Sequence, residues 1–155
     1  MPAFSSVGYQ ALQDLRTIGV ASLPQVDPRD HKIRELPKIG ESLDYVPSVL
    51  YTPHGPTQSD AAAFDGTSGR IYSFEVCIVA GREGDFGSDQ KSTQTLHEQL
   101  IRGIERTSDE DFRTELPNCP TVWSVEIDSA PTFDRSKLND NYAYLSVLVR
   151  VRSME

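Results

Sequence analysis

The residues of this sequence that are best suited to chemistry include three histidines, and one of them belongs to an HE pair. His97 and Glu98 lie on an expected helix, as in the HExxH motif, which places two zinc-binding histidines on one helical face. The second ligand is missing, because Ile101 occupies its position. His31 and His54 stand in proline-bearing segments that we interpret as loops, with no cysteine or histidine nearby. We therefore expect no metal site and a solvated His97.

The glycines of GREGDFG (81–87) follow an expected strand and precede an expected helix, as in phosphate-binding loops. Their spacing fits neither GxGxxG nor GxxxxGKS, and Glu83 and Asp85 would repel a phosphate. No acidic pair has the spacing of an EF-hand calcium loop. The pairs in question are Asp85/Asp89, Asp109/Asp111 and Asp128/Asp134. We interpret these segments as connections and solvated loops, and we expect no cofactor.

Nucleophilic catalysis has no recognisable motif in this sequence. A G-x-S-x-G elbow is missing, and neither Cys77 nor Cys119 has a histidine nearby in the chain. We expect two reduced thiols, with Cys77 buried in an apolar strand. The sequence therefore favours a protein that is not an enzyme. An enzyme with a site assembled from distant residues such as His97, Asp85 and Cys119 remains an alternative.

Composition limits the partners that the chain can bind. Its 155 residues contain 23 acidic and 15 basic side chains, for a formal net charge of −8. This balance argues against non-specific binding to nucleic acid, which needs clustered Lys and Arg. The length suits a single domain (1–155), with an N-terminal helix and extended segment (1–44) before a sheet–helix core (45–152). The first twenty residues resemble no signal peptide, and we expect no membrane span.

Apolar periodicity predicts two helices that would position these residues. A short amphipathic helix is expected over residues 6–18, with Ser5 or Ser6 as its N-cap and Gly19 as its terminator. A longer helix is expected over residues 91–107, where leucines and isoleucines form one stripe.

Strand patterns complete the predicted fold. Strands are expected at 47–51, 70–80, 121–127 and 141–152, and long loops at 54–69 and 128–141. Pro47 restricts the first strand to a sheet edge or a strand start. In the third strand, Trp123, Val125 and Ile127 are expected to point inward. The sequence predicts an α+β fold: a mostly antiparallel sheet covered on one face by one or two helices, with long loops.

One face of the last predicted strand has the composition of a protein interface. It combines tyrosines and arginines, the residues enriched where proteins meet. We expect the two arginines to pair with carboxylates of the same or a neighbouring subunit. The predicted interface residues are Asp85, Phe86, Tyr142, Tyr144, Arg150 and Arg152.

Five segments between residues 36 and 153 carry a family resemblance. They are LPKIGESLDYVPSVLYTP, RIYSFEVCIVAG, TLHEQLIRGIERT, TVWSVEIDSAP and NYAYLSVLVRVRS. In this order they resemble the tail-terminator proteins of tailed bacteriophages, of the minor tail protein U type, and related neck proteins. The long loops at 54–69 and 131–141 depart from the smaller members of that family.

The resemblance implies a structural virion protein, assembled in the host cytoplasm, that forms a homohexameric ring. Such a ring caps the tail tube protein, meets the head connector or stopper protein, and lets DNA pass without specific binding. An acidic chain suits that channel. A stopper or adaptor of the same neck, a small intracellular enzyme, and a regulatory binding module using the same strand face remain alternatives.

Overall fold

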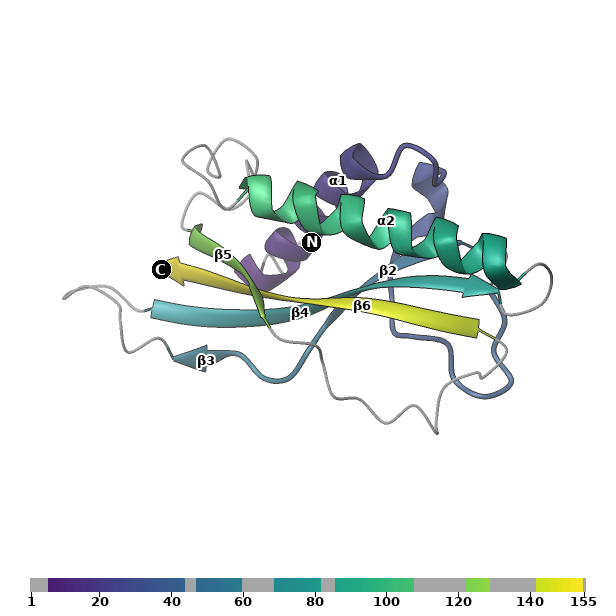
Figure 1. Ribbon diagram of the computed structural model, residues 1–155. Coiled ribbons are helices and arrows are strands. Elements are labelled where there is room, and N and C mark those ends of the chain that lie inside the picture. Colours follow the sequence, from purple (N-terminus) through teal and green to yellow (C-terminus); the bar gives the residue numbers. More distant parts are fainter. Residues whose placement is uncertain are drawn as a thin grey trace.

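The computed structural model describes residues 6–43, 47–59, 69–81, 86–107, 122–128 and 142–154 (Figure 1). Its elements are α1 (Val7–Ser22), a 3₁₀ turn (Pro28–Asp30), β1 (His31–Ile33), β2 (Ser48–Pro53), β3 (Gln58–Ser59), β4 (Gly69–Gly81), α2 (Phe86–Thr107), β5 (Val122–Asp128) and β6 (Tyr142–Met154). The predicted α+β fold is confirmed, because these strands form one open sheet that is mostly antiparallel.

The strands are ordered β1-β2-β4-β6-β5, and the short β3 also pairs with β4. The central pair is β4 and β6, which run antiparallel along their whole length. Among the described strands, β1 and β2 form the one parallel pair. The outermost described strand, β5, is shorter and pairs with Leu148–Ser153 of β6.

Both helices lie on the same side of the sheet, as Figure 1 shows. Each contributes an apolar stripe to the main core, and the sheet contributes alternate residues because successive strand side chains point to opposite faces. The buried residues of this core include Leu12, Leu15 and Ile18 of α1, Leu96, Leu100 and Ile104 of α2, and Val76, Ile78, Val147 and Val149 of the sheet.

A smaller apolar cluster occupies the other face of the sheet. It is formed by Leu36, Leu50, Cys77, Val79 and Tyr144, and Leu43 packs against it. Because Leu36 and Leu43 belong to the segment that follows β1, residues 34–43 cover part of the face that the helices leave open. Cys77 is a buried thiol that is not part of a disulfide, as expected from its apolar strand; Cys119 lies outside the described residues.

The helices are longer than the sequence patterns indicate. Ser6 caps α1, since its side chain accepts the backbone N–H of Tyr9. The helix continues past Gly19 to Ser22, and Gly19 instead provides room for the Tyr51 hydroxyl, which a side-chain carbon there would overlap. The second helix begins at Phe86, within the stretch expected to be a loop.

Two strand expectations need correction. His31 does not lie in a loop but begins β1 and is buried. In β5, Val125 and Ile127 face the main core as expected, and the side chain of Trp123 lies outside the described residues. Val122 is buried on the same side as Val125, because the register of β5 is irregular between Val122 and Ser124. Part of the expected loop 54–69 forms β3. Pro47 directly precedes β2, which confirms the predicted strand start.

Candidate functional site

The two arginines predicted to lie at an interface form ion pairs within the chain. Arg150 Nη2 lies 2.5 Å from Asp128 Oδ2, and Arg152 Nε lies 3.7 Å from Glu126 Oε1. Each arginine of β6 thus reaches a carboxylate of β5 diagonally across the strand pair. The expectation that these arginines pair with carboxylates of the same or a neighbouring subunit is confirmed for the same subunit. The charges of the two arginines and the two carboxylates therefore balance. Such partly exposed ion pairs contribute at most about 1 kcal/mol each to the stability of the fold.

Tyr144 does not belong to that surface. It is buried in the cluster on the helix-free face, beside Cys77 and Val79, and the prediction of an exposed interface tyrosine is wrong here. The reason is that residues 34–43 cover this part of the sheet. Tyr142 begins β6 and Phe86 begins α2, but their side chains lie outside the described residues, as does Asp85.

The face of the sheet that carries Tyr144 also carries a buried carboxylate, that of Glu75 on β4. The sequence did not mark this residue as functional. Glu75 is almost fully buried, and its Oε1 accepts a 2.6 Å hydrogen bond from the Ser146 hydroxyl. His54 Nδ1 lies 3.8 Å from Glu75 Oε2. The carboxylate stands between the hydroxyl and the imidazole, whereas an activated serine requires the histidine in the middle. This cluster therefore satisfies a buried charge and does not activate a nucleophile.

His97 also has a partner that the sequence did not reveal. Its Nε2 donates a 3.2 Å hydrogen bond to the backbone carbonyl of Ser146, and the side chain is half-buried. The expectation of a solvated histidine is therefore wrong. The interaction fastens α2 to β6, because the helix crosses the sheet close to that strand.

A histidine–tyrosine pair lies in the core where β1 and β2 meet α1. His31 Nδ1 and the Tyr51 hydroxyl are 2.7 Å apart, and Arg16 Nε donates a 2.7 Å hydrogen bond to the His31 carbonyl. Burial, assisted by the positive charge of Arg16, lowers the pKa of His31 from 6.5 to about 4. Burial also raises the pKa of Tyr51 well above its usual value, against the smaller effect of Arg16. Both side chains are neutral at pH 7 and hold the core together.

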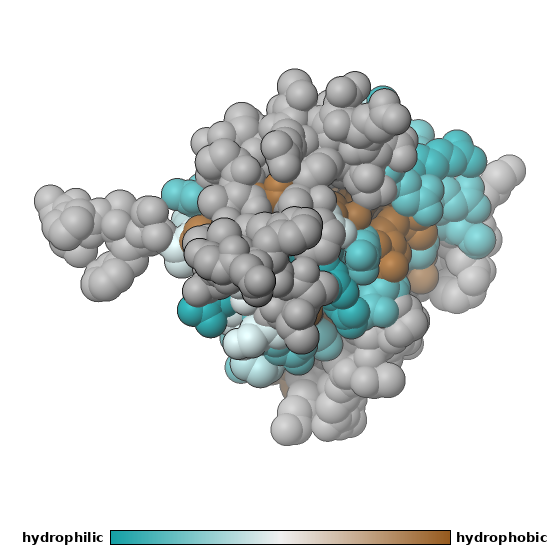
Figure 2. Space-filling model, turned by 90° about the vertical axis from the view of Figure 1, so that its left-hand side faces the viewer, coloured by the Kyte–Doolittle hydropathy of each residue, from teal (hydrophilic) through white to brown (hydrophobic). Residues whose placement is uncertain are grey.

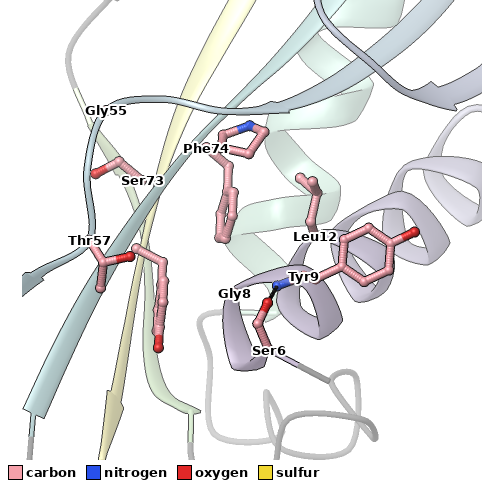
Figure 3. A pocket seen from close by; sticks show the side chains of 10 residues that line it. Ser6, Gly8, Tyr9, Leu12, Gly55, Thr57, Ser73 and Phe74 are labelled. Carbon is pink, nitrogen blue, oxygen red and sulfur yellow. Dashed lines mark hydrogen bonds between the residues drawn. The ribbon is translucent and has the colours of Figure 1, made fainter. Parts of the chain in front are cut away.

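A pocket of about 460 Å³ opens between the beginning of α1 and the end of β2 (Figure 3). Its walls combine aromatic and aliphatic side chains with hydroxyl groups, and none of the described residues that line it is charged. The hydroxyl of Ser6 is engaged as the helix cap (Figure 3). The lining residues are Ser6, Gly8, Tyr9, Leu12, Pro53, Gly55, Thr57, Tyr72, Ser73 and Phe74.

This pocket has the size and the lining of sites that take a small ligand or the side chains of a partner. Sequence periodicity places Tyr9 and Leu12 on one helix face, and Tyr72 and Phe74 on one strand face. The periodicity gives no indication that residues 53–57 form the rest of the pocket wall. Figure 2, which looks onto the side of the molecule where β3 lies, shows apolar surface exposed between hydrophilic residues.

Within the described residues, no group of three or more potential ligands could hold a metal ion. No helix among them is long and apolar enough to cross a membrane. Neither a family model nor a curated protein sequence matches the chain.

Proposed function

We propose that this protein is a structural component of the neck of a tailed bacteriophage, a tail terminator whose copies form a ring that caps the tail tube and meets the head connector. The observation that supports this most directly is the element order of the sheet. The long antiparallel β4–β6 pair is interrupted in sequence by α2 and β5, and a preceding helix lies on the same face as α2. The resemblance rests on the order of the segments between residues 36 and 153, and α1 precedes them.

Two further features agree with an assembly role. The sheet is open, and its described helices share one face, which leaves strand edges and part of the other face for neighbouring copies to cover. The chain carries a net charge of −8, and the arginines of β6 are already paired, so a ring of these chains would repel a DNA duplex that passes through it.

The test is the mass of the full chain under native conditions, over a wide range of concentration, followed by electron microscopy with a tail tube protein. We expect a hexamer that forms at high concentration or on the end of the tube. A protein that stays monomeric throughout and never binds tube ends would contradict the proposal. A ring that binds the connector but not the tube would instead identify the stopper or adaptor alternative.

A further inference from the structure

Among the described residues, two large apolar side chains are substantially exposed. Ile39 is 72% exposed and Tyr9 is 50% exposed. Tyr9 forms part of the pocket beside α1, whereas Ile39 lies in the segment that crosses the helix-free face. Tyr9 therefore belongs to an apolar hollow, which is the pocket, and Ile39 is an apolar projection from the surface.

The projection is held on a well-defined turn. Gly40 has a φ of +87°, and Glu41 N–H donates a 3.0 Å hydrogen bond to the Lys38 carbonyl, as in a type II turn with Ile39 at its second position. Arg34 Nη2 lies 3.2 Å from Glu41 Oε2 and braces the base of the turn. Because the backbone of the turn is already fixed, little backbone entropy is lost when Ile39 binds.

The hollow and the projection lie on opposite faces of the sheet. The pocket is lined by Leu12 and Phe74, which belong to the core under the helices. The turn follows Leu36, which packs in the cluster on the other face. Ile39 therefore stays exposed within one chain and cannot reach the pocket of the same chain.

We propose that Ile39 of one copy inserts into the pocket beside α1 of the next copy. Such a contact joins two different surfaces, so it propagates head to tail and closes into a ring when the rotation between copies permits. The inference rests on the proposed ring function and names the side chain and the pocket that build the ring.

Charge does not oppose this pairing of surfaces, although the chain is acidic. The charged groups of the turn are balanced, since Arg34 pairs with Glu41 and Lys38 Nζ lies 3.7 Å from Glu35 Oε2. Within the part of the chain that the structure describes, no charged side chain lines the pocket. Two copies can therefore meet here with little like-charge repulsion. One inserted side chain covers far less than the roughly 800 Å² per partner of a stable interface, so assembly should be weak and concentration-dependent.

The first experiment measures the assembly of the full chain by light scattering and native mass spectrometry. Ile39→Asp should remove the projection, and Thr57→Asp should place a charge in the pocket. Both positions are exposed, so folding should be unchanged, and thermal melting checks this. Each variant should need at least about tenfold more protein to assemble, whereas the matched controls Ile39→Leu and Thr57→Ser should assemble like the wild type.

The second experiment mixes the two aspartate variants in equal amounts. The Thr57→Asp chain still has its projection and the Ile39→Asp chain still has its pocket, so one contact per pair is possible. A second contact would bring the altered projection of the Ile39→Asp chain to the altered pocket of the Thr57→Asp chain. The two introduced aspartates repel each other, so this contact cannot form. We expect a heterodimer that does not grow, whereas each variant alone stays monomeric at the same concentration.

The outcomes separate this inference from the proposed function. Rings formed by Ile39→Asp at the wild-type concentration, or no heterodimer in the mixture, would overturn the inserted-isoleucine contact and leave the ring proposal standing. A wild-type chain that is always monomeric would overturn both. Open chains built through Ile39, with no closed ring and no binding to a tail tube, would support the contact and contradict the terminator function.

Discussion

His31 and Tyr51 are joined in the core by a 2.7 Å hydrogen bond between the imidazole Nδ1 and the phenol hydroxyl. The two residues come from β1 and β2, the parallel pair of the sheet. Among the described residues, the other imidazole nitrogen of His31 has no hydrogen-bond partner. Protonating the imidazole would place a buried charge and an unpaired N–H in the core, so acid should weaken the fold at this pair.

The stability of the fold should fall as the pH drops from about 6.5 toward 4. The pKa of His31 is about 4 in the folded chain and 6.5 in a solvated histidine, so the unfolded chain binds the proton more readily in this window. The stabilisation is complete above pH 6.5 and is lost as the pH falls through the window. Urea unfolding of the wild type and of His31→Gln at pH 7, 6, 5 and 4.5 measures it. A wild-type stability that falls no more steeply than that of the variant would contradict the assignment.

Gly19→Ala should destabilise the protein by about 1–3 kcal/mol, although alanine is ordinarily the better helix residue. The added methyl group would overlap the hydroxyl oxygen of Tyr51. Chemical denaturation gives the free energy of unfolding. The matched control is Gly19→Ala combined with Tyr51→Phe, which should be less destabilised than the sum of the single variants. A stabilising Gly19→Ala would mean that Tyr51 does not pack as described.

Ser146→Ala should cost about 1.5–3 kcal/mol, because it removes a hydrogen bond to the buried carboxylate of Glu75. A double-mutant cycle with Glu75→Gln isolates the interaction between these two residues. We expect a smaller effect of Ser146→Ala in the Glu75→Gln background, since the amide carries no charge. Equal effects in both backgrounds would show that Ser146 acts through packing alone.

The wild-type chain should show no measurable affinity for duplex DNA at physiological salt. Its net charge of −8 repels phosphates within a Debye length of about 8 Å, and Arg150 and Arg152 are paired with Asp128 and Glu126. Fluorescence anisotropy with a labelled duplex measures this. Replacing both arginines with alanine should leave DNA binding at zero and weaken assembly. Submicromolar binding by the wild type that this double variant loses would favour a nucleic-acid-binding role.

The local elements of this protein follow from its sequence. The alternation of apolar residues predicted β4 and the buried face of β6, and the serine before the first apolar stripe predicted the cap of α1. These features depend on neighbours in the chain, and periodicity records which side of an element is apolar. The α+β class follows because such elements can bury their apolar sides only by packing helices onto a sheet.

The candidate sites were decided by tertiary structure. Periodicity placed Tyr144 and the arginines on one strand face, but it could not indicate that residues 34–43 cover the tyrosine while the arginines meet β5. Gly19 has the sequence signature of a helix terminator, but it lies inside α1, where the hydroxyl of Tyr51 leaves no room for a side chain. The pocket joins residues 6–12, 53–57 and 72–74, whose proximity arises only when the sheet forms. Contacts between distant segments depend on which surfaces remain to be covered, and no local pattern encodes that.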